Sequence, residues 1–306
     1  MNDLPTPQTV LLSGASGMIG RALKKELSSR GYSVHTLVRR EPTDSSEHQW
    51  DPATGVVPQD IVDYADVIVN LSGASLSRIP WTPAHKKLVL SSRKQVAQTL
   101  GKAIAASKTP PHTLLQASAV GFYGHRGDDE LTEDSAVGDG FLASVTKQWE
   151  EAAAPIESDT TRVVYARTGL VIARTGAMAP LRLQTFLGVA GPIGSGQQWW
   201  PWISYRDEIR ALVFLMENKK LKGAFNLVGP TPARAIEVTK ALAKLMRRPH
   251  WLGLPTFAVK FMGEAGPEIL LSSQRILPKR LLDAGFNFEH STITDAIGAI
   301  PELKSS

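Results

Sequence analysis

Short apolar runs alternate with amphipathic stretches through the first two-thirds of the chain. Residues 9–13 form a run of β-branched and aliphatic side chains, residues 18–30 repeat apolar positions at helical spacing, and residues 32–38 form a second strand-like run. This order is typical of a βαβ unit in a parallel sheet. Gly31 follows the predicted helix and is well placed to end it, because glycine adopts the left-handed conformation of a helix cap at little cost.

The alternation continues to about residue 246 and predicts six or seven parallel strands. Thr82 and Pro83 provide an N-cap and a first-turn proline for a long helix that reaches about Ser107. The stretch through Trp50 is polar, and no element is predicted there. We therefore predict an α/β fold, namely a Rossmann-type doubly wound parallel sheet with a smaller C-terminal substrate lobe. Further strands are predicted at 66–71, 113–118, 162–167 and 225–227, and further helices at 140–156, 206–218 and 234–246.

The pattern also suggests three parts. Residues 1–187 are predicted to form a dinucleotide-binding Rossmann domain whose sheet is completed by later segments, and residues 188–248 supply elements of the substrate lobe. From residue 249 onward the alternation gives way to short apolar helices separated by Gly and Pro. A segment this short is too small to form a stable core alone. We expect the module at 249–306 to pack on the substrate lobe.

Composition removes several classes of protein. The 306 residues are 42% hydrophobic and 21% charged, which is ordinary globular usage. The chain has no cysteine, which excludes disulfides, thiolate ligands and a cysteine nucleophile. Its seven histidines show no paired metal spacing, and there is neither a G-x-x-x-x-G-K-[ST] loop nor a G-x-S-x-G elbow. No metal site, P-loop nucleotidase or serine hydrolase is predicted.

Charge and hydropathy bear on partners and location. The net charge is +5, but the basic residues form separate short groups without a nucleic-acid-binding motif, so no nucleic-acid partner is predicted. The first eight residues carry no basic cluster or long apolar region, and no apolar run approaches the roughly 20 residues that span a bilayer. We expect a cytoplasmic protein without a membrane partner. The oligomeric state stays open.

A glycine-rich turn stands between the first predicted strand and helix. It reads G-x-x-G-x-x-G over residues 14–20. Such glycines permit a tight turn and a close approach of backbone N–H groups to a diphosphate, which then faces the helix N-terminus. This strand-turn-helix context favours a cofactor-binding turn over the alternative, a glycine-rich turn without a ligand. The predicted cofactor contacts here are Gly14, Ser16, Gly17, Met18, Ile19 and Gly20.

The end of the second strand bears on the choice of dinucleotide. NAD-binding units place an Asp or Glu there to bind the ribose 2′-hydroxyl, whereas this chain has Arg39 and Arg40. A guanidinium can bind a 2′-phosphate through paired hydrogen bonds. The sequence therefore predicts NADP(H) as the cofactor, with a solvated arginine pair as the alternative.

Several motifs resemble the extended short-chain dehydrogenase/reductase superfamily, and within it an NAD(P)-dependent epimerase subfamily with a small C-terminal module. The resemblance covers nearly the whole chain. It implies that Ser118 is catalytic and lies beside the nicotinamide, and that Leu71, Ser72, Gly73 and Arg93 belong to the cofactor site. The motifs are Asn70–Gly73, Ser92-Arg93, Ser118–Gly124, Phe141–Ala143, Trp149-Glu150, Arg167–Gly169, Gly194–Gln197, Trp202-Ile203, Gln274–Pro278 and Ala284–Phe286.

The chain departs from the superfamily at its Tyr-x-x-x-Lys pair, in which the lysine and cofactor lower the pKa of the tyrosine. Counting back from Glu150 puts the two slots on Leu142 and Thr146, and the subfamily shares this loss. Tyr123 follows Ser118 by five residues and is the nearest substitute as a catalytic group. Its alternative role is an aromatic wall of the pocket.

The resemblance also implies that the loops after Gly188 enclose the substrate. Trp199, Trp200 and Trp202 suit either a ring-bearing substrate or a hydrophobic lid over the cofactor. Asp207 is interpreted as a helix cap.

Two functions remain open. The first is an NADP-dependent oxidoreductase or epimerase acting on an unknown small molecule through Ser118 and Tyr123. The second is a protein that senses or binds NADP(H) with weak or no catalysis.

Overall fold

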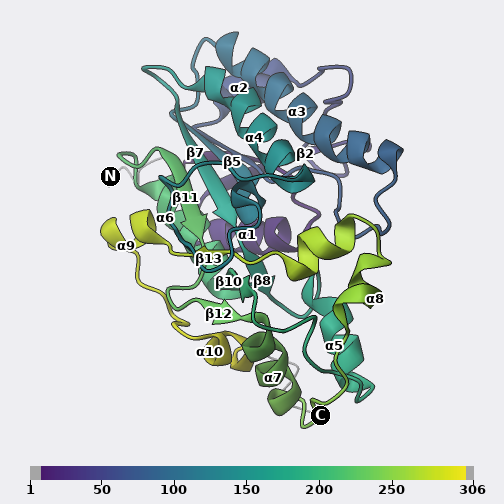
Figure 1. Cartoon of the computed structure of the whole chain (residues 1–306). Coiled ribbons are helices and arrows are strands. Elements are labelled where there is room, and N and C mark those ends of the chain that lie inside the picture. The colour runs from purple at the N-terminus through teal and green to yellow at the C-terminus, as the bar shows by residue number, and fades with distance from the viewer. Residues whose placement is uncertain (1–7, 301–306) are drawn as a thin grey trace.

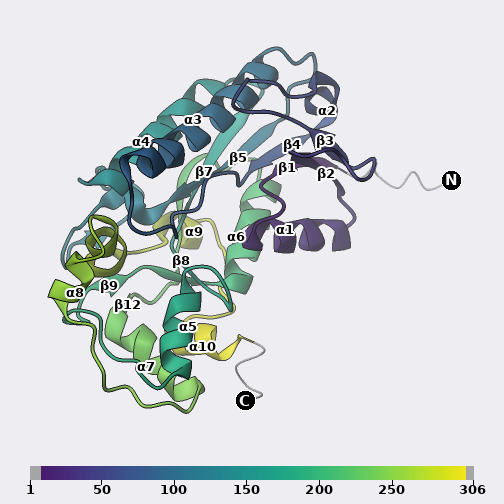
Figure 2. The ribbon, with the colours of Figure 1, turned by 90° about the vertical axis from the view of Figure 1, so that its right-hand side faces the viewer.

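The computed structural model describes residues 8–300 and is built around a seven-stranded sheet. The strand order is β11-β7-β5-β4-β1-β2-β3, and every neighbouring pair is parallel (Figures 1 and 2). The predicted count of six or seven parallel strands is confirmed. The chain adds strands on one side of β1 and then on the other, so the order reverses between β1 and β4. The strands are β1 (Thr9–Ser13), β2 (Ser33–Val38), β3 (Glu47–Gln49), β4 (Val67–Asn70), β5 (Thr113–Ala119), β7 (Arg162–Thr168) and β11 (Gly223–Leu227).

Helices cover both faces of this sheet, as expected for a doubly wound fold (Figure 2). α1 (Met18–Ser29) and α6 (Tyr205–Glu217) pack on one face, and α2 (Gln59–Tyr64), α3 (Pro83–Ala105) and α4 (Phe141–Ala153) on the other. Val10 and Leu12 of β1 belong to the first of these cores and Leu11 to the second. This is the period-two alternation of a strand buried on both sides.

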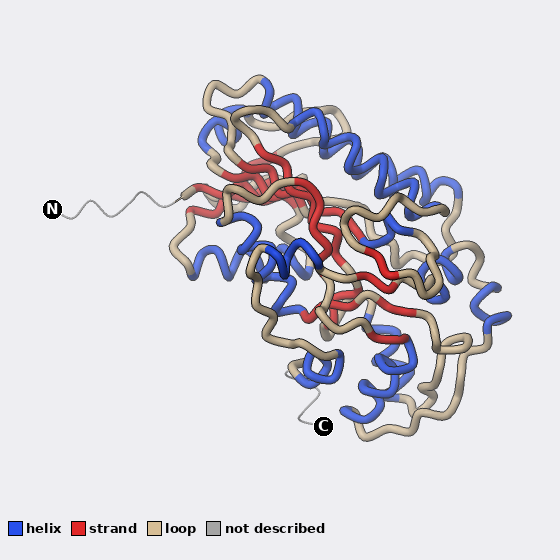
Figure 3. Tube along the Cα trace, turned by 60° about the vertical axis from the view of Figure 1, so that its left-hand side comes forward, coloured by secondary structure: helices blue, strands red, loops and turns tan. Residues whose placement is uncertain are grey.

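A smaller region lies beyond the carboxyl edge of the sheet, where Figure 3 shows short strands separate from the main layer. β8 pairs with β10 in parallel and β9 with β12 antiparallel. Its core includes Trp200, Trp202, Val238 and Ile297. The elements are β8 (Leu170–Ile172), α5 (Met178–Phe186), β9 (Trp199–Trp200), β10 (Trp202–Ser204), β12 (Ala233–Arg234), α7 (Ala235–Leu245), α8 (Thr256–Lys260) and α10 (Ile293–Gly298).

The described residues after 249 divide between the two regions. α10 packs in the core of the smaller region, whereas Leu281 of α9 (Lys279–Asp283) and Phe286 join the core under the main sheet. β13 (Arg275–Ile276) pairs with β6 (Glu130–Leu131). The module therefore packs on the lobe and also on the Rossmann sheet. The remaining elements are the 3-10 helices Val120–Tyr123 and Ala154–Ile156 and a π-helix at Pro267–Leu271.

Some local features match the sequence and others differ. The Thr82 hydroxyl caps α3 by accepting from the His85 N–H, and Gly31 has φ +87°. β3 was not predicted, because this edge strand is polar and half-exposed and lacks apolar alternation. No helix of residues 8–300 has the length and apolar character needed to cross a membrane.

Candidate functional site

The glycine turn brings β1, α1 and the end of β4 into close backbone contact. A Cβ on Gly14, whose φ is +77°, would lie 2.7 Å from the carbonyl carbon of Leu71. A Cβ on Gly20 would lie 2.2 Å from the Gly14 carbonyl oxygen. Both positions exclude any side chain. The turn lies beside the switch in strand order between β1 and β4, where open α/β sheets bind ligands.

The N-terminus of α1 is left open for an anion. Gly17 precedes the helix in extended conformation and offers no side-chain cap, and the first turn carries no acidic residue. The first N–H groups of a helix have no partner within it. Arg21 N–H reaches the Gly17 carbonyl, but the N–H groups of Met18, Ile19 and Gly20 make no backbone bond among residues 8–300. These uncapped donors and the glycine cradle fit the diphosphate of a dinucleotide.

A cavity of about 240 Å³ joins this turn to Ser118. It brings together predicted residues from the turn, from the end of β4 and from the end of β5. Ser16, Arg39, Arg40, Ser72, Gly73 and Arg93 do not line it. The lining residues are Gly14, Gly17, Met18, Ile19, Gly20, Leu71, Ala117, Ser118, Ala166, Thr168, Glu208 and Leu212.

The two arginines after β2 differ. Arg40 donates two hydrogen bonds to Glu47, at 2.7 and 2.6 Å. These bonds, together with two from Thr43, lower the pKa of the Glu47 carboxyl to about 2. Arg39 is exposed and makes no hydrogen bond or ion pair within the described chain. The guanidinium available for a further anion is therefore that of Arg39.

Arg93 organises the loop after β4. Its guanidinium donates to the carbonyls of Ala74 and Val89 at 3.2 and 2.9 Å and lies 4.9 Å from the Trp149 ring centroid. A Cβ on Gly73 would come within 3.1 Å of this guanidinium. Burial lowers the pKa of Arg93 to about 10. Arg93 fixes the shape of this loop, and its contact with the cofactor stays a prediction.

Ser118 lies at the end of β5 and is held by a buried ion pair. Its hydroxyl donates to Glu150 of α4 at 2.5 Å. Arg167 of β7 donates to both oxygens of the same carboxylate at 2.9 and 2.8 Å. The Arg167 guanidinium also lies 3.6 Å from the Phe122 ring centroid. Ser118 therefore lines the cavity with its hydroxyl proton directed to Glu150.

The interpretation of Tyr123 as a catalytic group needs correction. Its side chain is 0% exposed and does not line the cavity. Its hydroxyl donates to Asn226 at 2.7 Å and accepts from Arg167 at 2.9 Å. Burial raises the pKa of the Tyr123 hydroxyl, and the nearby Arg167 charge offsets part of this rise. The phenol is thus a structural group whose hydrogen bonds are used inside the protein.

The slots of the missing Tyr-x-x-x-Lys pair face the loop after β5. A Cβ on Gly121 would lie 3.2 Å from the Leu142 Cβ and 3.6 Å from the Thr146 hydroxyl. That hydroxyl donates to the Leu142 carbonyl at 2.7 Å. The backbone of the usual catalytic helix is present, but neither slot carries a side chain that can take over the tyrosine's proton transfer.

The three tryptophans do not act alike. Trp200 and Trp202 are buried in the core of the smaller region, with their ring N–H groups bonded to the carbonyls of Leu270 and Thr231. They are core residues and do not form a lid or a substrate surface. Trp199 is half-buried and donates to Asp128 at 2.6 Å, with Arg234 over its ring.

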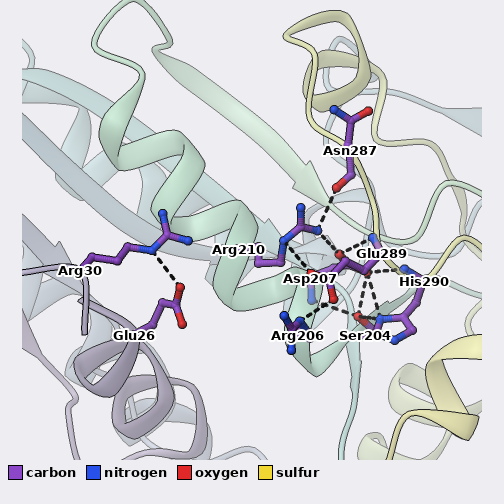
Figure 4. Close-up of polar contacts among 9 residues, drawn as sticks. All are labelled: Glu26, Arg30, Ser204, Arg206, Asp207, Arg210, Asn287, Glu289 and His290. Carbon is purple, nitrogen blue, oxygen red and sulfur yellow. Dashed lines mark hydrogen bonds and ion pairs between the residues drawn. The ribbon is translucent and has the colours of Figure 1, made fainter. Parts of the chain in front are cut away.

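A larger groove of about 1190 Å³ lies between α1, α6 and the chain around α10. Behind its lining, the buried Asp207 accepts backbone N–H bonds from Glu289 and His290, and Ser204 caps α6 (Figure 4). Asp207 is therefore not the predicted cap. His290 presents the same nitrogen, Nδ1, to Ser204 and Asp207 at 3.0 and 3.4 Å. A proton relay needs both ring nitrogens, so this group anchors the C-terminal segment instead.

Glu150, Arg167 and Glu208 are site residues to which the sequence analysis assigned no role. Glu150 and Arg167 occur in motifs that were recognised, but their contact could not be read from sequence. Glu208 did carry a signal. It lies four residues before Leu212 on the buried face of α6, where a charged residue is unusual.

The chain is similar to known proteins over nearly its whole length. The chain is 38% identical over 290 residues to the epimerase family protein ML0860 of Mycobacterium leprae, covering 94% of each chain. It is 33% identical over 297 residues to the epimerase family protein YfhF of Bacillus subtilis, covering 95% of this chain and 97% of that protein. The crystal structure of the human epimerase family protein SDR39U1 with NADPH matches with a TM-score of 0.86 and 31% identity, covering 97% of this chain and 98% of that one.

Family models assign both parts of the chain. Residues 254–300 match a domain of unknown function, DUF1731, which corresponds to the expected C-terminal module. Residues 10–229 match the NAD dependent epimerase/dehydratase family. Since that match covers most of the chain and includes the glycine turn and Ser118, the chain belongs to the NAD dependent epimerase/dehydratase family.

Proposed function

We propose that this protein binds NADP(H) and is an oxidoreductase or epimerase acting on a small molecule beside Ser118. The observation that carries the choice of dinucleotide is Arg39, an exposed guanidinium that makes no hydrogen bond or ion pair within residues 8–300, at the strand end where NAD-binding units carry an acid. The similar human protein SDR39U1 was solved with NADPH, which supports the same choice.

Different residues of the site would bind the cofactor and the substrate. When bound, the dinucleotide supplies hydride transfer. The uncapped N–H groups of α1 bind its diphosphate, and Arg39 binds the 2′-phosphate. Ser118 has its proton directed to Glu150, so its oxygen is free to accept a hydrogen bond from a substrate hydroxyl. The buried ion pair of Glu150 and Arg167 keeps the serine in that orientation.

A specific observation favours a second candidate, an NADP(H)-binding protein with weak or no turnover. Proton transfer by a positioned side chain typically contributes about 10²–10⁴-fold to such reactions. Leu142 and Thr146 fill the usual slots, and Tyr123 is buried and hydrogen-bonded. A screen of ketones and sugar nucleotides with NADP(H) separates the two candidates: turnover supports the first, and tight NADPH binding without turnover at any pH supports the second.

The dinucleotide preference is tested by calorimetry. A charge-assisted contact to the 2′-phosphate is worth about 1.5–3 kcal/mol, so NADPH should bind about ten- to a hundredfold tighter than NADH. Arg39→Ala should remove most of this preference and leave NADH binding unchanged. Arg40→Ala is the matched variant and should have a smaller effect, because that guanidinium is already bound to Glu47. Equal affinity of the wild-type protein for both dinucleotides would refute the assignment.

A further inference from the structure

A buried acid with one unpaired oxygen lines the same cavity as the glycine turn and Ser118. Glu208 is in the first turn of α6 and is 1% exposed. Its Oε1 accepts the Thr168 hydroxyl proton at 2.8 Å. Its Oε2 is buried and has no hydrogen-bond partner among residues 8–300. Buried polar atoms are normally paired, so this oxygen is available to a polar group that enters the cavity.

No charge in the described structure compensates Glu208. It is the one ionisable side chain among the cavity's lining residues. The charged side chains on neighbouring elements bind other partners. On α6, Asp207 and Arg210 bind each other and the segment around Glu289. Arg167 of β7 binds Glu150, and Arg21 of α1 donates to the Ser16 carbonyl.

The other described elements around Glu208 also place no charged side chain beside its carboxyl. Lys25 lines the outer groove, and β1, β8 and β10 contribute no ionisable side chain. Burial raises the pKa of the Glu208 carboxyl to about 8, against a smaller lowering by the Thr168 hydrogen bond. At neutral pH Glu208 is therefore mostly a carboxylic acid, with one O–H to donate.

We propose that Glu208 is a further cofactor-binding residue, whose Oε2–H donates a hydrogen bond to an acceptor oxygen of the dinucleotide between the glycine turn and Ser118. This inference rests on the proposed NADP(H) binding. The dinucleotide is rich in acceptor oxygens, in its diphosphate and its carboxamide, and a neutral acid can donate to them. An ionised carboxylate at this place would be repelled by the diphosphate. Binding therefore retains one proton on Glu208.

The test is the dissociation constant of NADPH measured from pH 6.5 to 9.5. For the wild-type protein we expect a constant value at the low end and a loss of about tenfold for each pH unit above about 8. Glu208→Gln keeps the shape, accepts from Thr168 and can donate from its amide, so it should bind at the wild-type level at pH 6.5 and lose the pH dependence. Glu208→Met lacks the donor and should bind about five- to tenfold more weakly at pH 6.5, again without pH dependence.

A second measurement does not need the cofactor. The folded-state pKa of Glu208 is raised, so the wild-type protein should lose stability to urea as pH rises from about 4.5 toward about 8, and Glu208→Gln should lose less over this range. An NADPH affinity that is independent of pH in the wild-type protein, or equally pH-dependent in Glu208→Gln, overturns the inference and leaves the proposed function standing. No NADPH binding by the wild-type protein at pH 6.5 overturns both.

Discussion

The two halves of the carboxyl edge of the sheet differ in whether their polar groups have hydrogen-bond or ion-pair partners. In the half around β1, called the open half below, several polar groups are left unpaired: the first N–H groups of α1 are uncapped, and Arg39 has no ion-pair partner in the described chain, although the neighbouring Arg40 binds Glu47. In the half around β5 and β7, called the paired half below, the polar groups already bind one another, as in the contacts from Ser118 to Glu150 and from Tyr123 to Asn226.

The difference indicates what this site is built to do. Unpaired donors around a rigid glycine turn favour binding of a phosphate-bearing ligand. Donors that are already paired favour a fixed framework, because breaking such contacts costs energy before any new ones form. Glu208 lies in the cavity that joins the two halves. Like several polar groups of the open half, it has an unpaired polar atom, because its Oε2 has no hydrogen-bond partner in the described chain. The site thus has unpaired groups that can bind a cofactor, whereas, within the described residues, its candidate groups for proton transfer are absent or already hydrogen-bonded.

The largest expected effect comes from removing Glu150, the acid that binds both Ser118 and Arg167 in the half around β5 and β7. Glu150→Ala leaves the Arg167 guanidinium, whose side chain is 6% exposed, without its carboxylate. Removing one partner of a buried pair costs about 3–5 kcal/mol, and we expect a loss of this size in urea denaturation. Glu151→Ala is the control on the next position of α4. That carboxylate is exposed and lies 3.8 Å from Lys147, so the loss should stay below about 1 kcal/mol.

Equal stability of the two variants would show that the Glu150 and Arg167 contact does not hold the framework. NADPH binding at the other half should persist in any Glu150→Ala protein that stays folded, because the glycine turn shares no hydrogen bond with this pair.

The next prediction concerns the open half. Gly20→Ala places a Cβ 2.2 Å from the Gly14 carbonyl oxygen, and because the atoms that this Cβ meets belong to the backbone of the turn, the turn must move. We expect NADPH affinity to fall about a hundredfold, equivalent to about 2.7 kcal/mol. Gly17→Ala is the matched control: its Cβ would lie 3.3 Å from the same oxygen, a contact that a small shift relieves. Calorimetry, with circular dichroism to check folding, measures both. Similar NADPH affinity for the two variants would mean that backbone spacing in the turn does not control binding.

The open half was predictable from sequence and the paired half was not. The turn, its helix and the strand before it are contiguous, so local spacing predicted them. The bond between Tyr123 and Asn226 joins residues 103 positions apart, and no local pattern indicates it. The tryptophans show the same limit. Composition could not distinguish a lid from a core, whereas the structure puts the rings of Trp200 and Trp202 in the core of the smaller region.

The smallest expected effect comes from removing one hydroxyl of the paired half. Tyr123→Phe takes a donor from Asn226 and an acceptor from Arg167, so we expect a loss of about 1 kcal/mol in urea denaturation. NADPH affinity and any turnover should be unchanged, including at alkaline pH, because burial raises the pKa of this phenol and keeps it neutral. Tyr64→Phe alters a phenol whose side chain is 61% exposed and should change neither stability nor turnover. If Tyr123→Phe instead abolishes turnover at unchanged stability, the phenol acts on a substrate, and the paired half opens during the reaction.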